Sequence, residues 1–210
     1  MPDFYEEAKD LFNYTQALRR DFHENPELGF QETRTAGIVA SELREMGIEI
    51  STGIAHTGVI GLIEGDKPGP VVLLRFDMDA LPIVEDTGAK YTSKNEGVMQ
   101  ACGHDGHTAI GLTAAKILNQ HRDLIQGTVK IVFQPGEEGC GGAELMVKEG
   151  VLANPIPDYT LALHLWNEIP VGTIGVSPGP VMAASETFKI KLVGRGAHGG
   201  LPHEGVDPIV

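Results

Sequence analysis

Two continuous apolar runs, each followed within a few residues by two carboxylates, limit most strongly what this sequence can fold into. Val71–Leu74 leads to Asp77 and Asp79, and Val129–Phe133 leads to the adjacent pair Glu137–Glu138. A strand without polar alternation is buried on both faces, which is typical of a parallel sheet covered by helices on each side. The runs therefore predict buried parallel strands that carry acidic side chains at their carboxyl ends.

Helical periodicity alternates with strand-like segments along most of the chain, which predicts an α/β fold with a mostly parallel sheet flanked by helices. The expected helices cover residues 5–21, 32–46, 108–119 and 143–148, and the expected strands cover 58–63, 71–74, 129–133 and 159–163. Beyond His164, the segments 172–176 and 187–193 alternate apolar with polar residues, as half-exposed antiparallel strands do. We therefore expect one domain over residues 1–184 and the beginning of a second over 185–210.

The segment Ala101–His107 concentrates a thiol, two imidazoles and a carboxylate between glycines. Cys102 and His104 are ligand types that zinc-like ions take, and Gly103 between them allows the chain to bend so that both face one ion. Ligands of open α/β sheets bind beyond the carboxyl ends of the strands, and His164 closes a further strand. We expect a metal site where these ends meet. The alternative is a buried free thiol, surface histidines, and carboxylates that only cap strands and helices.

The net charge of −13 disfavours nucleic acid and anionic membranes as partners, because both are polyanions. No apolar run reaches membrane-spanning length. With only two cysteines, the chain is not a disulfide scaffold. Residues 1–7 lack the basic and apolar regions of a signal peptide, so we expect a cytoplasmic location in which both thiols are free.

The adjacent carboxylates Glu137 and Glu138 suit the hydrolysis of an amide. Neighbouring residues at a strand end point in different directions, so one carboxylate can bind a metal while the other faces a water that the metal activates. A zinc-like ion lowers the pKa of its water to about 7. The second carboxylate can then take the proton of that water and pass it to a leaving amine.

Six motifs resemble those of the metal-dependent amidohydrolase and carboxypeptidase family that includes hippurate hydrolase, the aminoacylases and the plant auxin-conjugate hydrolases. They occur in the family's order and span nearly the whole chain: HENPEL at 23–28, DMDALP at 77–82, ACGHDGH at 101–107, QPGEEG at 134–139, ALH at 162–164 and GAHG at 196–199. As a set they are specific, and the Cys-Gly-His-Asp block is similar to the hippurate-hydrolase-like branch. The resemblance implies a zinc-exopeptidase-like catalytic domain followed by the start of a small α+β satellite domain.

The resemblance also implies roles for single residues. The implied metal ligands are Cys102, His104, Glu138 and His164. Glu137 would be the general base and acid, and Asp79 a supporting carboxylate that orients the site. His198 resembles a histidine that reaches a partner subunit's active site, where it would polarise the scissile carbonyl or hold the substrate. The implied cofactors are one or two divalent ions, zinc, manganese or cobalt. The implied substrate is a small-molecule amide such as an N-acyl amino acid, and the full-length protein would be a homodimer.

Family members continue beyond this length and supply a further histidine ligand near their C-terminus, so we expect either a fragment or a chain that a partner completes. Two other readings stay open. One is a metal-binding fragment without catalysis. The other is a hydrolase that uses Cys102 as its nucleophile with His104 or His107, which leaves Glu137, Glu138 and His164 without a role. The pattern assigns no role to His23, His107 or Cys140.

Overall fold

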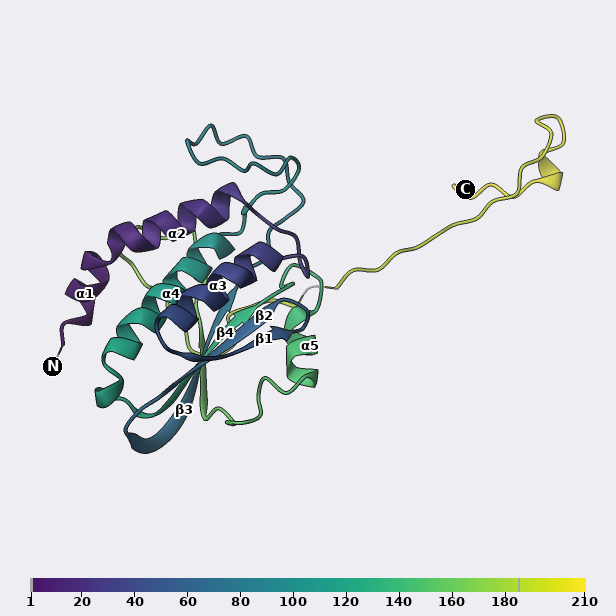
Figure 1. Ribbon diagram of the computed structural model, residues 1–210. Helices are drawn as coiled ribbons and strands as arrows, with labels where there is room; N and C mark the ends of the chain where they lie inside the picture. Colours follow the sequence, from purple (N-terminus) through teal and green to yellow (C-terminus); the bar gives the residue numbers. More distant parts are fainter. Residues whose placement is uncertain (1, 185) are drawn as a thin grey trace. The chain divides into compact units, whose positions relative to one another are not determined.

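The computed structural model describes residues 2–184 and 186–210. The chain divides into two compact units, Met1–Trp166 and Asn167–Val210. The first unit is built on a five-stranded sheet with helices on its faces (Figure 1). The domain boundary that the sequence suggests falls at residue 185, which lies outside the described residues, so that boundary stays a prediction.

The first unit contains all the strands assigned in the described residues. The strands are β1 (Glu49–Ile54), β2 (Gly58–Glu64), β3 (Lys67–Asp77), β4 (Gln126–Gln134) and β5 (Tyr159–Ala162). Its helices are α1 (Phe4–Asp10), α2 (Phe12–Glu24), α3 (Thr33–Glu45), α4 (His104–Gln120) and α5 (Gly142–Lys148), with the short 3₁₀ helix η1 (Arg122–Leu124). Across the described residues, no helix combines the length and the apolar character needed to cross a bilayer.

The second unit differs from what its alternating pattern predicts. Neither 172–176 nor 187–193 forms a strand in the structure as described. The described part of this unit contains the 3₁₀ helix η2 (Pro202–Glu204) and an isolated antiparallel bridge between Arg195 and Val206. A strand needs a hydrogen-bonded neighbour, so alternation alone does not produce one where no partner lies alongside.

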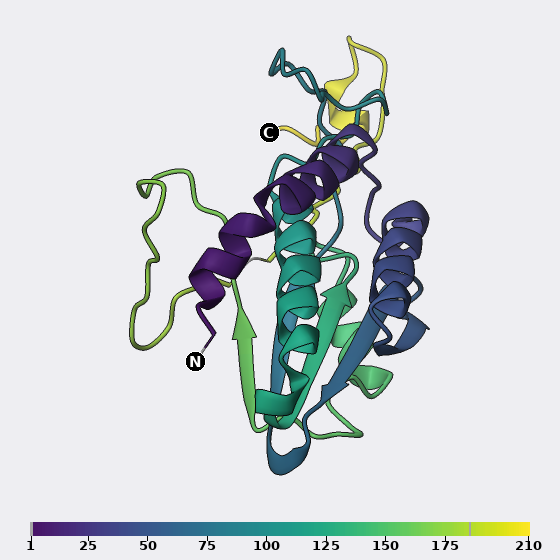
Figure 2. The same ribbon diagram turned by 60° about the vertical axis from the view of Figure 1, so that its left-hand side comes forward.

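The strands are ordered β1-β2-β4-β3-β5, and β3 is parallel to both β4 and β5. Strand β2 pairs antiparallel with β4, and β1 pairs antiparallel with β2. The predicted α/β fold is therefore confirmed, with parallel strands on one side and an antiparallel pair on the other. Strand β1 is absent from the sequence-based expectation, because most of its side chains are exposed and it has no apolar run. Strand β5 forms the opposite edge (Figure 2).

The hydrophobic core lies in two layers, one on each face of the sheet. The larger layer packs α2, α3 and α4 against the sheet, and the smaller one packs α5 against the other face (Figure 1). Strand β4 contributes to both, because Ile131 and Phe133 face the larger layer while Val132 faces the smaller one. This explains why its sequence reads as a continuous apolar run.

Two helix boundaries differ from the expectation. Helix α4 begins at His104, four residues earlier than predicted, so His104 and His107 lie on its first turn and not in a preceding loop. The single helix expected over 5–21 is divided at Leu11 into α1 and α2. The hydroxyl of Thr15 donates to the Leu11 carbonyl at 3.1 Å, a local bond that competes with regular helix geometry and bends helices.

Helix α4 lies so close to the sheet that a methyl group at Gly111 has no space. A Cβ there would lie 2.7 Å from Cδ2 of Phe76 and 2.9 Å from Cε1 of Phe133. We expect Gly111→Ala to lower the free energy of unfolding by about 1–3 kcal/mol, because overpacking exceeds the gain in helix propensity. Urea denaturation measures this, with Gly37→Ala as the control. A Cβ at Gly37, on exposed α3 surface, would meet nothing within 4 Å, so that change should stabilise.

Candidate functional site

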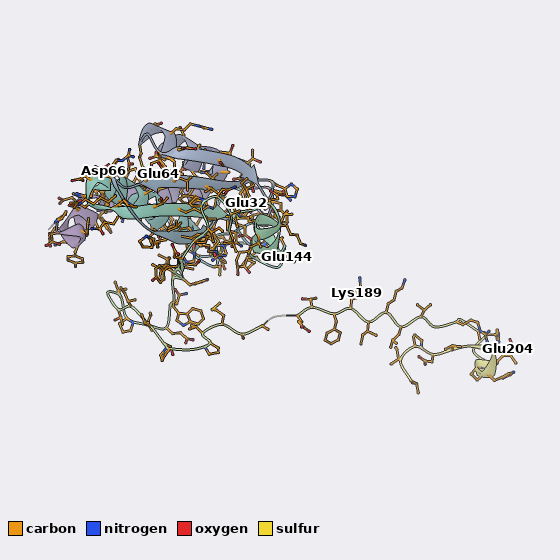
Figure 3. The ribbon with its side chains drawn as sticks, turned by 90° about the horizontal axis from the view of Figure 1, so that it is seen from below. Glu32, Glu64, Asp66, Glu144, Lys189 and Glu204 are labelled. Atoms are coloured by element: carbon orange, nitrogen blue, oxygen red, sulfur yellow. The ribbon has the colours of Figure 1, made fainter. Side chains whose placement is uncertain are left out.

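The predicted site residues gather at one end of the sheet. Strands β3 and β4 run parallel and end side by side, with Asp77 paired to Gln134. Figure 3 shows Glu64 and Asp66 together at the opposite end of the sheet, whereas Glu32 lies toward the end that holds the candidate site. The Glu32 carboxylate accepts a hydrogen bond from the Gly136 backbone N–H at 2.9 Å, which fixes the loop after β4.

His104 is the centre of the cluster and is completely buried. Its Nδ1 donates to the carbonyl of Asp79 at 2.8 Å, so its proton is on Nδ1 and its Nε2 carries a lone pair. That Nε2 lies 3.9 Å from a carboxylate oxygen of Glu137 and 3.9 Å from one of Glu138. The imidazole is thus held on one side by the backbone and presents its free nitrogen to the acidic pair.

Asp79 contacts both His104 and the loop that carries Glu138. Its Oδ1 lies 3.4 Å from Nδ1 of His104, and its Oδ2 accepts the backbone N–H of Glu138 at 2.9 Å. Burial alone would raise the pKa of Asp79, but the hydrogen bonds from His104 and the loop backbone outweigh burial and lower it. Asp79 therefore stays ionised and positions both His104 and Glu138.

Three buried acceptor atoms in this cluster have no hydrogen-bond partner among the described residues: Oδ1 of Asp79, Nε2 of His104 and Oε1 of Glu138. A buried polar atom without a partner costs about 1–3 kcal/mol. Nε2 of His104 and Oε1 of Glu138 lie 3.9 Å apart, and two such lone pairs that face each other without a donor are what a divalent cation satisfies. The residues present therefore fit a metal ion.

Cys102 and His164 form the other side of this candidate centre. The sulfur of Cys102 lies 3.4 Å from Nε2 of His164, and the ligand atoms of Cys102, His104 and His164 all lie within 4.8 Å of one another. Gly103 has φ +92°, a left-handed conformation that favours glycine, and it provides the bend expected between Cys102 and His104. Both thiols of the chain are free, as expected.

Asp77 and His107 are linked beside the cluster, a pairing that sequence reasoning missed. Nδ1 of His107 donates to Oδ1 of Asp77 at 2.5 Å, and Arg75 donates to Oδ2 at 2.6 Å. Burial alone would raise the pKa of Asp77, but His107, His104 and Arg75 outweigh burial and lower it to about 2. No local signal in the sequence indicates this pairing, because Asp77 and His107 lie 30 positions apart and meet only in the folded chain.

The carboxylates give the cluster a negative field. Burial lowers the pKa of His104, yet Asp79 and Asp77 outweigh that effect and raise it above its ordinary value. Burial and the neighbouring carboxylates of Glu138 and Glu137 raise the pKa of the Cys102 thiol to about 12. In both groups the contribution of the carboxylates is the one expected of a site that favours added positive charge. Glu137 is the more open of the acidic pair, with a side chain 38% exposed against 26% for Glu138.

His23, for which the sequence indicates no role, lies in a buried ion-pair network and not among the candidate ligands. Its Nδ1 pairs with Asp105 at 2.6 Å and its Nε2 with Glu85 at 3.2 Å. Arg19 also reaches Asp105, at 3.0 Å. Because Glu85 belongs to the loop between β3 and α4, His23 anchors that loop on helix α2.

The network predicts a pH-dependent contribution to stability. The hydrogen bond with Asp105 raises the pKa of His23, although burial opposes it. A raised folded pKa gives a contribution that is complete below about pH 6.5 and is lost as pH rises through the folded pKa. We expect His23→Gln to lower the free energy of unfolding by about 1–3 kcal/mol near pH 6, and by less near pH 9. Denaturation at both pH values tests this, with His203→Gln, an exposed position, as control. A pH-independent difference would contradict it.

Two remaining residues lie apart from the cluster. His198 belongs to the second unit, where it is exposed and its Nδ1 accepts the Gly200 N–H at 3.1 Å. Its role at the substrate stays a prediction. Cys140 is exposed, and its thiol donates a long hydrogen bond of 3.8 Å to the Glu138 carbonyl. This gives Cys140 no place among the candidate ligands.

Comparisons with known proteins found a family profile and relatives that are similar to this chain. The profile of Peptidase family M20/M25/M40 matches residues 73–206. Thermostable carboxypeptidase 2 of Saccharolobus solfataricus is 44% identical over 206 residues, which are 97% of this chain and 52% of that protein. The N-acyl-L-amino acid amidohydrolase of Geobacillus stearothermophilus is 47% identical over 195 residues, 92% of this chain and 52% of that one. The chain thus spans about half the length of these relatives.

Among solved structures, the Bacillus subtilis YXEP protein, described as a dinuclear metal binding peptidase from the M20 family, superimposes with a TM-score of 0.78. It is 44% identical, and the match covers 82% of this chain and 48% of that one. The fold derived from the apolar runs is therefore the fold of this structure.

Proposed function

The chain belongs to peptidase family M20/M25/M40, and on this premise we propose that it acts as a metal-dependent hydrolase of the amide bond in N-acyl amino acids or related small amides. The observation that carries the proposal is the pair of buried acceptors, on His104 and Glu138, that face each other without a partner among the described residues, beside the open carboxylate of Glu137. The amidohydrolase relative supports N-acyl amino acids as the substrate class.

The donor set favours a divalent cation with mixed nitrogen, sulfur and oxygen ligands. The residues that would hold it are Cys102, His104, Glu138 and His164. When bound, such an ion polarises the amide carbonyl and makes water acidic enough to react at neutral pH. Zinc suits the thiolate and imidazoles, manganese or cobalt are the other candidates, and the site would hold one or two ions.

Glu137 would be the general base and acid of the reaction. Its exposed carboxylate can take a proton from the attacking water and deliver it to the departing nitrogen, so that the amide becomes a carboxylic acid and an amine. Glu138 differs in that its backbone N–H is held by Asp79 and one of its oxygens is buried without a partner. This division assigns proton transfer to Glu137 and metal binding to Glu138.

Other parts of the proposal concern the whole protein. We place the catalytic domain at residues 1–184 and the start of a satellite domain at 185–210. His198 would hold the substrate in a partner subunit's site, which requires a homodimer. The location would be cytoplasmic, where a free Cys102 remains available as a ligand.

Hydrolysis of a panel of N-acetyl and N-benzoyl amino acids, before and after chelation and metal restoration, tests the proposal. We expect turnover that chelation removes and metal restores. Bound metal without turnover of any panel member would favour the non-catalytic alternative. Turnover that resists chelation but stops on thiol alkylation would favour Cys102 as nucleophile. A nucleophilic cysteine must ionise without the help of a metal, and burial together with Glu138 and Glu137, which raise the pKa of the Cys102 thiol to about 12, opposes that alternative.

A further inference from the structure

Leu165, the residue after His164, is held by two groups from the first turn of helix α4. Its backbone N–H donates to Nε2 of His107 at 2.9 Å. Its side chain lies over Gly103 and Gly106, and a Cβ built on Gly106 would lie 2.5 Å from Cδ1 of Leu165. The backbone and the side chain of Leu165 are therefore both fitted to this turn.

Both ring nitrogens of His107 take part in hydrogen bonds. Because its Nε2 accepts the N–H of Leu165, its proton is on Nδ1, which donates to Asp77. Arg75 in turn pairs with Asp77 at 2.6 Å. Although Asp77, His104 and His107 offer ligand atoms close together, both ring nitrogens of His107 are occupied. His107 is therefore not available as a metal ligand.

His164 depends on Leu165 for its orientation. Strand β5 ends at Ala162, so sheet pairing does not fix His164, and its side chain is exposed, so core packing does not fix it either. Its Nδ1 donates to the carbonyl of Leu165 at 2.7 Å, which leaves Nε2 facing the Cys102 sulfur. The ring of His107 also packs edge-on against that of His164, with centroids 4.7 Å apart.

We propose that His107 and Gly106 are positioning residues that latch Leu165 onto helix α4 and thereby aim His164 at the candidate metal centre. The inference rests on the proposed function, because it assigns His164 as a ligand. His107 supplies the acceptor for the Leu165 backbone, and Gly106 supplies the space for its side chain. Neither residue would be a ligand, because both ring nitrogens of His107 are hydrogen-bonded and Gly106 has no side chain.

Two substitutions at His107 separate positioning from general stability. Asn keeps a donor at the place of Nδ1 for Asp77 but is too short to reach the Leu165 N–H, whereas Gln places an oxygen near the position of Nε2. We expect His107→Asn to weaken Co²⁺ binding by about 10- to 100-fold, as loss of an outer support of a ligand does. His107→Gln should restore most of that affinity, although both variants lose the same buried ring and should unfold at similar temperatures.

A third substitution separates metal affinity from stability. Gly106→Ala adds a residue of high helix propensity within α4 but displaces Leu165, so Co²⁺ affinity should fall while thermal stability does not. In a Leu165→Ala background the displaced side chain is gone, and Gly106→Ala should then have no further effect on affinity. Gly37→Ala, in open space on α3, is the matched control.

Co²⁺ titration followed by its thiolate absorption band, together with hydrogen exchange of the Leu165 amide, decides the outcome. Wild-type affinity in both His107→Asn and Gly106→Ala would overturn the latch and leave the proposed function intact. A wild-type protein that binds no Co²⁺ would instead overturn the proposed function. The latch is then judged by exchange alone: protection of the Leu165 amide that disappears in His107→Asn supports it, and exchange that does not change refutes it.

Discussion

Glu137→Gln is expected to lower kcat for an N-acyl amino acid by about 10²- to 10⁴-fold while the protein binds metal as tightly as before. The amide of Gln has nearly the same shape as the carboxylate but cannot take a proton from water. Glu138 keeps its backbone hydrogen bond to Asp79 and its place beside His104. The substitution therefore removes proton transfer and leaves the candidate ligands in position.

Steady-state kinetics measure kcat, and isothermal titration with Zn²⁺ on the same preparation measures the metal affinity. Glu144→Gln is the matched control, because Glu144 lies on α5 and pairs only with Lys148 at the surface. We expect its kcat within about two-fold of wild type, as for exposed ion pairs of little energetic worth. Retention of full activity in Glu137→Gln would exclude Glu137 as the general base. Loss of metal together with activity would reassign it as a ligand.

His104→Ala is expected to weaken metal binding by more than about 100-fold, because loss of a ligand exceeds the effect of losing an outer partner. His104 is completely buried, and its Nε2 is one of the three acceptors without a partner. Metal content after dialysis and the affinity for Zn²⁺ measure the effect. His203→Ala, at an exposed histidine of the second unit, should bind as wild type.

Folding must be checked in the same experiment, because His104→Ala also leaves the Asp79 carbonyl without its donor. We expect the variant to lose about 1–3 kcal/mol of stability and to remain folded by circular dichroism. Wild-type metal affinity in folded His104→Ala would remove His104 from the ligand set. Cys102, Glu138 and His164 would then need another centre.

Much of the fold could be predicted because its signals are local. The apolar runs 71–74 and 129–133 identify β3 and β4, and helical periodicity identifies α3 and α5 within a residue or two. Strand β1 could not be predicted, because an exposed edge strand carries no apolar run. The segments 172–176 and 187–193 show the opposite case, in which the pattern of a strand is present and a partner is not.

The candidate site divides in the same way. From the sequence, the carboxylates that follow buried strands could be placed together at the carboxyl ends of those strands. Gly103 indicated the bend between Cys102 and His104. The structure brings these groups together, while their individual roles remain predictions. His23 and His107 could not be interpreted, because each depends on a partner far away in the chain, Asp105 for one and Leu165 for the other.

The sequence by itself determined the α/β architecture and the inventory of groups at the strand ends, because periodicity and strand-end chemistry are written in neighbouring residues. Only the tertiary structure decided which buried atoms are left without a partner and which histidine supports another. His104 Nε2 and Glu138 Oε1 become recognisable as a candidate cation site only when every competing donor has been placed. Hydrogen-bond satisfaction is a property of packed atoms from distant segments, and no local pattern encodes it.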